Sequence, residues 1–212
     1  MNRVKSAFEI VKKYPIPLFA IPFAYSALEL GFFTKYMVAH GIMTNPMVLF
    51  AGDKVDVQSI SLILLSMLFS AIFATGYIPM ILIAVDGGQL GLSSFKIFLT
   101  GRRLWKIILL SLIVFPLSVL TLSYGFIITV MAYPIIVSSS EAKVVESIKR
   151  SIVITEGSRF KIFCYMFVYC VLEFLIFNVP VIFAVVMDMI LTPLFYIVLA
   201  LLYRECMNKH AQ

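Results

Sequence analysis

The sequence predicts an all-α, polytopic membrane protein with about six transmembrane helices, arranged as three hairpins that each follow a short amphipathic interfacial helix. Hydrophobic residues make up 62% of the 212 residues and charged residues only 13%, against roughly 45 to 50% and 25% in ordinary globular chains. The apolar excess gathers into runs of helical length, and basic residues gather on one side of these runs. Together these observations indicate a single integral membrane domain over residues 1–212.

The apolar runs set the number of expected spans. A bilayer core about 30 Å thick needs about 20 helical residues. The runs cover residues 14–36, 60–85, 104–120, 125–137, 160–177 and 181–203. The third and fourth runs together are too long for one comfortable span and short for two. Leu122-Ser123-Tyr124-Gly125 offers a break, so we expect two spans over 104–137. Judged by length alone, one span over these residues is the alternative.

The distribution of Lys and Arg favours six spans. Cytoplasmic segments of membrane proteins carry an excess of basic residues. With the N-terminus inside, six spans place fifteen Lys and Arg on the inner side and only Lys35 and Lys54 outside. We therefore expect a multi-pass protein of the cell membrane with cytoplasmic N- and C-termini. The net charge is +6, and the basic residues are scattered over the ends of the runs. A nucleic-acid-binding protein would gather its basic residues into a patch, so no nucleic acid is expected as a partner.

An internal repeat accompanies the spans. A shift of 55 residues superposes residues of the same type: Pro79 on Pro134, Asp86 on Glu141, Thr100 on Thr155, Trp105 on Phe160 and Lys106 on Lys161. Such self-similarity is the signature of a repeated structural unit. It predicts units of about 1–86, 87–137 and 138–212, each made of a short amphipathic helix, a turn and a helical hairpin.

The third unit carries the clearest signals for a surface helix, over residues 138–157. Ser138 and Glu141 are spaced as a capping box at a helix start, and Gly157 is the expected left-handed stop. The apolar residues that recur at helical spacing, and that we expect to turn toward apolar surroundings, are Val145, Ile148 and Ile152. This helix should lie along the inner membrane surface.

The other two units repeat this design. The second surface helix is expected to end at Gly101, and the first should place Val4, Phe8 and Val11 on one face. Basic residues near these helices could each gain about 1 kcal/mol from anionic lipid headgroups. The residues expected to do so are Arg103, Lys106, Lys149, Arg150 and Lys161.

The last third of the chain resembles a known membrane family. The matching segments are Tyr133 to Val137, Glu146 to Ser151, Thr155-Glu156-Gly157 and Phe160 to Phe163. They resemble the signature of the YciC-like and glycerophosphodiesterase membrane-domain proteins. Ser147 stands where that group usually has alanine, and Glu205-Cys206 replaces its usual ending. The resemblance implies a membrane architecture more than an activity, since the group is mostly of unknown function and its membrane domain is not catalytic.

Reactive residues in the spacing of a known active site are missing. The two histidines, His40 and His210, lie near opposite ends of the chain and on opposite sides of the expected membrane. Neither a metal cluster nor a Ser/His pair can be built from them. Phosphate-binding and hydrolase glycine motifs are absent as well. We therefore predict no catalytic residues, no metal and no cofactor, and we expect Cys164, Cys170 and Cys206 to be free thiols.

Acidic residues inside the apolar runs are the most informative polar residues. Glu29, Glu173 and Asp188 lie roughly 20 to 24 Å from the cytoplasmic ends of their runs, counted at about 1.5 Å per residue. A charged acid near the middle of a membrane costs at least about 2.5 kcal/mol. These acids are either hydrogen-bonded packing residues or a site for a substrate, proton or cation, and we expect Glu173 and Asp188 to turn into the bundle.

Two functions follow from these observations. The first is a non-catalytic membrane module that organises lipids or partner proteins through its surface helices. The alternative is a small transporter or channel that uses Glu29, Glu173 and Asp188. The expected partners are membrane lipids, together with a membrane protein or a second copy of the chain.

Overall fold

The fold was obtained as a computed structural model. It describes residues 3–28, 57–91, 94–95, 101–121, 124–139, 141–177 and 181–211. Over these residues the chain forms helices and turns and no strand. The helices are α1 (Arg3–Lys13), α2 (Pro15–Leu28), α4 (Val57–Val85), α6 (Gly101–Leu120), α7 (Tyr124–Thr129), α8 (Ala132–Ser138), α9 (Val144–Ile154), α10 (Arg159–Phe177) and α11 (Val181–Ala211). The all-α prediction is thus confirmed for the described residues.

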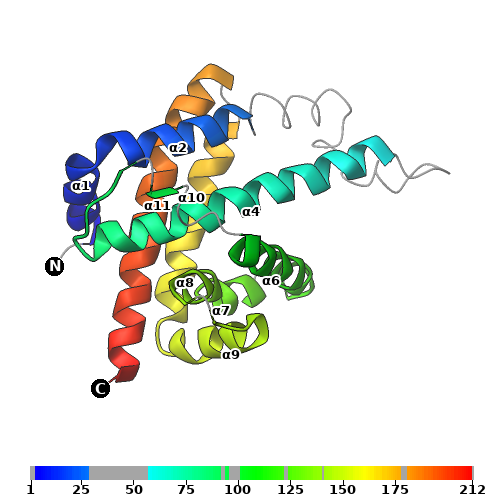
Figure 1. Ribbon diagram of the computed structural model, residues 1–212, viewed down its shortest axis with the longest axis vertical. Coiled ribbons are helices and arrows are strands. Elements are labelled where there is room, and N and C mark those ends of the chain that lie inside the picture. Colours follow the sequence, from blue (N-terminus) through cyan, green and yellow to red (C-terminus); the bar gives the residue numbers. More distant parts are fainter. Residues whose placement is uncertain are drawn as a thin grey trace.

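The long helix α11 is the central element of the fold. It packs against α1, α2, α4, α9 and α10, and Figure 1 shows it running through the molecule while α2 and α4 cross it. Its 31 residues correspond to a length of about 46 Å. The helix continues past the predicted end at residue 203, because its last turns still contact neighbouring helices through Glu205 and Met207.

Within the part of the chain that the structure describes, two helices are long and apolar enough to span a membrane. The qualifying segments are Leu68–Val85 in α4 and Phe183–His210 in α11. Helices α6 and α10 coincide with the third and fifth apolar runs, and α2 covers the first half of the first run. The finer expectation of six spans is not shown by these helices.

The fourth apolar run, residues 125–137, does not form the single helix that was predicted. It divides into α7, of six residues, and α8, of seven residues, and Tyr124–Ser138 as a whole is shorter than the roughly 20 residues of a typical span. The cause lies at Pro134, which has no N–H to donate to the carbonyl of Val130. As the third residue of α8 it occupies a position where no such hydrogen bond is needed.

The predicted break between the third and fourth runs is confirmed. Helix α6 ends at Leu120 and α7 begins at Tyr124. A side chain at Gly125 would place its Cβ only 2.8 Å from the carbonyl oxygen of Leu117. Glycine therefore allows the start of α7 to approach the end of α6, and its N–H donates to the Thr121 hydroxyl at 2.6 Å.

The surface helix of the third unit is present but starts differently from the prediction. Ser138 ends α8 and donates its hydroxyl to the carbonyl of Ile135 at 2.9 Å, while Lys143 precedes α9 without a side-chain cap. The predicted capping box is wrong because Ser138 already belongs to the preceding helix. The predicted stop is confirmed, since Gly157 adopts a φ of 72°.

The inward face of α9 is built from small residues. Ser147 and Ser151 are buried, and the Ser151 hydroxyl donates to the carbonyl of Ile128 in α7 at 2.8 Å. Ile148 and Ile152 are half-buried, whereas Val145 is 60% exposed. Val145 would find apolar surroundings only in a membrane or against a partner.

Of the other two surface helices, α1 forms as predicted over Arg3–Lys13. Most of the second one, over residues 92–93 and 96–100, lies outside the described residues. Gly101 is the first residue of α6 and not the end of the preceding helix. Its φ is not in the left-handed region that a glycine stop would use.

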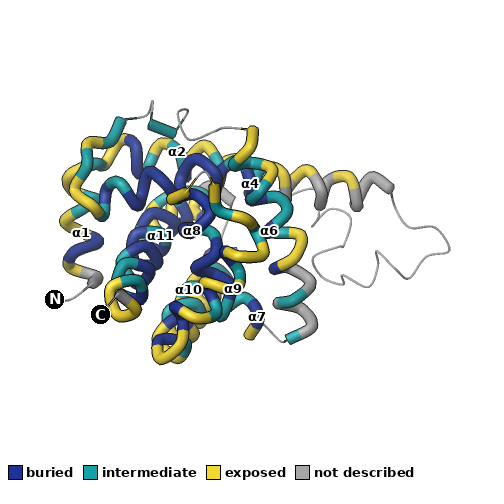
Figure 2. The backbone as a smooth tube through the Cα atoms, turned by 60° about the horizontal axis from the view of Figure 1, so that its bottom comes forward, coloured by how far each residue is buried: buried dark blue, intermediate teal, exposed yellow. Residues whose placement is uncertain are grey.

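Burial is uneven across the bundle. Figure 2 shows the buried residues concentrated along α11, α8 and the second half of α4. By contrast, α10 carries large apolar side chains on its outer face, of which Phe160, Phe163, Phe167 and Leu175 are exposed. A contiguous apolar face of this kind is unusual on a water-soluble monomer and marks a surface for a membrane or a partner.

A tyrosine compensates for a proline where α2 meets α4. Pro22 lies inside α2 and has no N–H to donate to the carbonyl of Leu18, which would leave a buried acceptor without its helical partner. The hydroxyl of Tyr77, which is fully buried in α4, donates to this carbonyl at 2.9 Å. The contact therefore satisfies the backbone and joins the two helices.

Replacing Tyr77 by Phe should lower the free energy of unfolding in detergent micelles by about 1 to 3 kcal/mol, because the Leu18 carbonyl loses its donor. The same substitution should cost clearly less in a Pro22→Ala background, because the alanine supplies the backbone N–H that proline lacks. Denaturant titrations of the four proteins give the coupling energy. Strictly additive effects of the two substitutions would contradict this account of the contact.

Candidate functional site

A buried carboxylate joins α2 to α11. Asp188 is 8% exposed, and its two oxygens accept hydrogen bonds from the hydroxyls of Ser26 and Thr192. Thr192 lies one turn further along α11 and donates at 2.7 Å, whereas Ser26 comes from α2. Hydrogen bonds to both oxygens offset part of the cost of burying a carboxylate.

Glu173 meets Asp188 through a tyrosine. Glu173 is half-buried on α10, and its carboxyl is hydrogen-bonded to the hydroxyl of Tyr169, one turn earlier on the same helix. Tyr169 also lies within electrostatic range of Asp188 and Tyr196 on α11. Both acids of the last hairpin are therefore within electrostatic range of the same tyrosine. Glu29, the third acid of the prediction, lies outside the described residues.

Aromatic rings surround this polar cluster. Phe195 packs between Tyr165 and Tyr169, with ring centroids 5.5 and 3.8 Å away. On the other side, Tyr196 meets Tyr77 edge to face at 5.5 Å. Ring pairs in these geometries stabilise a core beyond simple burial. They hold α4, α10 and α11 together next to the acids.

A second set of polar contacts lies toward the end of α11. Arg204 donates from two nitrogens to the two carboxylate oxygens of Asp86, at 2.9 Å for the Nε bond. Asp86 follows the last residue of α4, and Gly87 has a φ of 79°, so the helix ends at Asp86-Gly87-Gly88. This bidentate salt bridge fixes the end of α4 against α11.

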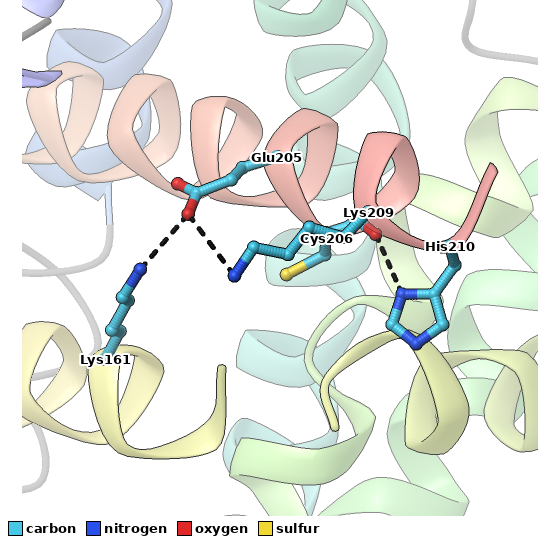
Figure 3. Close-up of polar contacts among 5 residues, drawn as sticks. All are labelled: Lys161, Glu205, Cys206, Lys209 and His210. Carbon is cyan, nitrogen blue, oxygen red and sulfur yellow. Dashed lines mark hydrogen bonds and ion pairs between the residues drawn. The ribbon is translucent and has the colours of Figure 1, made fainter. Parts of the chain in front are cut away.

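Glu205 organises the charges between α10 and α11. Its carboxylate accepts from Lys161 of α10 at 3.2 Å and lies 3.8 Å from Lys209 of its own helix (Figure 3). One turn beyond Cys206, His210 places Nδ1 3.0 Å from the Cys206 carbonyl oxygen. Lys161 was predicted to meet lipid headgroups, and here part of its charge is balanced within the protein.

The other predicted headgroup residues differ in their surroundings. Lys106 donates to the carbonyl of Ala142 at 2.6 Å, and Arg103 is half-buried. Lys149 and Arg150 are exposed on the outer face of α9, and an Arg150 nitrogen lies 3.9 Å from the sulfur of Met207. Helix α1 adds three exposed lysines that the prediction did not single out: Lys5, Lys12 and Lys13.

Sequence reasoning identified the acids but missed their partners. The spacing of Asp188 and Thr192, and that of Tyr169 and Glu173, is four residues, which places each pair on one helix face. That signal was available in the sequence. No local pattern connects Asp188 to Ser26, which is 162 residues away.

The described residues contain no group of three or more His, Cys, Asp or Glu side chains that could hold a metal ion. The three cysteines are free thiols, with Cys164 and Cys170 exposed and Cys206 buried. The arrangement therefore offers buried hydrogen-bonded acids and paired surface charges as its chemistry.

Comparisons of the chain with protein-family models, with curated proteins and with solved structures found no match. The resemblance to the YciC-like group therefore stays a prediction. Over the described residues, fold and site define an all-helical protein with two candidate membrane-spanning helices.

Ser26→Ala and Thr192→Val each remove one hydroxyl from Asp188, but only the first removes the link to α2. We expect each to lower the free energy of unfolding by about 1 to 3 kcal/mol. Ser26→Ala alone should also speed amide hydrogen exchange in α2, by about tenfold, because local opening of this helix becomes easier. Equal exchange of α2 in both variants would show that Ser26 does not anchor the helix.

Proposed function

We propose that the chain is a multi-pass protein of the cell membrane whose N- and C-termini are both cytoplasmic. The apolar outer face of α10 and the two helices of spanning length support this proposal. The excess of basic residues on one side of the six apolar runs gives its orientation. Six spans in three hairpins, with α7 and α8 together forming the fourth span, are the finer form of the same proposal.

Thiol labelling tests the orientation. In a variant whose three cysteines are replaced by alanine, a cysteine at position 53 should react with an impermeant maleimide added to intact cells. A cysteine in place of Glu146 should react only after the membrane is opened. Asp53 lies outside the described residues, and Glu146 is exposed on α9. Reaction of both positions from the same side would rule out the six-span arrangement.

For this membrane protein, we propose a non-catalytic role in which the surface helices bind anionic lipids and so organise the surrounding membrane. The observation that carries this proposal is the outer face of α9, where Lys149 and Arg150 are exposed beside Val145 and Val153. Cations next to apolar side chains suit the boundary between headgroups and acyl chains. Glu146 on the same face leaves the cations in excess.

Helix α1 offers a similar surface. Phe8 is 50% exposed and lies among the exposed Lys5, Lys12 and Glu9. Both helices contact the bundle and are therefore held in place: α1 packs on α2 and α11, and α9 packs on α7 and α8. A membrane protein or a second copy of the chain is the other partner in this proposal, with the apolar face of α10 as its contact surface.

Charge-neutral variants test the lipid proposal. Lys149→Gln and Arg150→Gln should each weaken binding of a short-chain phosphatidylglycerol to the protein in neutral micelles by about fivefold, since each cation contributes about 1 kcal/mol. Lys161→Gln removes the same charge but one that Glu205 already balances, so its effect should be smaller. Calorimetric titration at low salt measures all three, with phosphatidylcholine as the uncharged reference. Equal losses in all three variants would refute a specific role for α9.

A small transporter or channel is the second candidate function, in which Glu29, Glu173 and Asp188 carry a proton or cation. The electrostatic range of both Glu173 and Asp188 to Tyr169 supports it, because a pair of acids that lie close together can share a proton or a cation. Asp188→Asn separates the two candidates in sealed vesicles. Loss of uptake at unchanged folded yield would support transport, whereas a change in stability alone would exclude it.

A further inference from the structure

A partly open cavity lies among the helices, and Phe195 and Tyr196 form part of its wall. It has a volume of about 200 Å³ and is lined by residues of α4, α6, α7, α8 and α11. Protein interiors are close-packed and hold few voids larger than a water molecule. A cavity of this size, where several helices meet, therefore has room for a bound molecule.

The walls of the cavity are mainly apolar and partly aromatic. They are formed by Ala74, Ile78, Phe126, Val130, Phe195 and Leu199. Phe195 is held in place by its stacking on Tyr165 and Tyr169, and Tyr196 by its contacts with Phe73 and Tyr77. Because these rings are fixed by their neighbours, this wall resists collapse into the cavity.

Hydroxyl groups supply the polar part of the lining. Ser111 of α6 and Tyr133 of α8 lie 3.2 Å apart, and the Ser70 hydroxyl of α4 lies 2.9 Å from that of Tyr25. Each hydroxyl carries one donor and two acceptor positions. One hydroxyl of the Ser111 and Tyr133 pair donates its hydrogen bond to the other. The second hydroxyl can therefore still donate a hydrogen bond to a ligand, and the pair has free acceptor positions for a hydrogen bond from it.

None of the described residues that line the cavity is charged. A charged ligand would therefore lose its hydration without compensation. A neutral ligand with one hydroxyl or carbonyl group matches the lining. An apolar protein cavity of about 150 Å³ is known to accept benzene, so about 200 Å³ suits a single ring with a small substituent, and aromatic walls favour ring contacts.

We propose that this cavity is a binding site for a small neutral aromatic compound of one ring that carries a hydroxyl or carbonyl group. The ring packs against Phe126 and Phe195, and its polar group exchanges hydrogen bonds with Ser111 and Tyr133. This site is independent of lipid binding by α9 and uses none of the acids.

Phenol and toluene test the proposal, because they have nearly the same shape and differ in the hydroxyl. In the full-length protein with labelled isoleucine methyl groups, phenol should shift the Ile78 signal in a saturable manner. Ile113, which is 43% exposed on α6, reports partition of the probe into the micelle. Parallel, non-saturating shifts at both residues would overturn the proposal.

Two variants and a control complete the test. Ala74→Phe fills the cavity and should abolish the saturable shift, whereas Ala24→Phe, at an exposed position of α2, should preserve it. The double variant Ser111→Ala and Tyr133→Phe should weaken phenol binding about tenfold, which corresponds to about one hydrogen bond, and leave toluene binding unchanged. Phenol binding that survives Ala74→Phe, or an equal loss for both probes in the double variant, would refute the proposed site.

Discussion

Backbone hydrogen bonding inside an apolar interior is the constraint on which this structure depends. A buried carbonyl without a donor is costly, and the chain places prolines inside α2, α4 and α11, each of which removes one helical N–H. Tyrosine hydroxyls donate to backbone carbonyls near two of them. Tyr77 donates to the Leu18 carbonyl, which Pro22 leaves without its helical N–H. Tyr165 donates at 2.9 Å to the carbonyl of Phe195, two residues after Pro193, and this bond joins α10 to α11 without replacing the N–H that Pro193 lacks. The same bonds also join neighbouring helices.

The polar groups along helix α11 show how this constraint is met. Along its length it carries the buried Asp188, then the ring pair Phe195 and Tyr196, then the paired charges Arg204 and Glu205. Polar groups in its interior part are satisfied by hydroxyls, while those near its end are satisfied by opposite charges. This order matches a helix that passes from an apolar to an aqueous environment, which agrees with the proposed membrane location.

The surfaces and the interior of the bundle support different activities. The outer face of α9 combines exposed cations with exposed valines, which suits a lipid headgroup region. Among the described residues the bundle holds two further features: a hydrogen-bonded acid cluster and a cavity without a charged lining residue. Because Glu173 and Asp188 are not among the described residues that line the cavity, a ligand there would contact α4, α6, α7, α8 and α11 and not these acids.

The sequence by itself determined the helices and several of their ends. Apolar runs of helical length predicted α4, α6 and α10, and the glycine stop at Gly157 appears with its left-handed backbone, since such signals act within a few residues. Only the tertiary structure decided that Ser138 ends α8, that Ser147 and Ser151 face inward, and that Ser26 binds Asp188. These features depend on contacts between segments far apart in the chain, and local periodicity contains no information about such contacts.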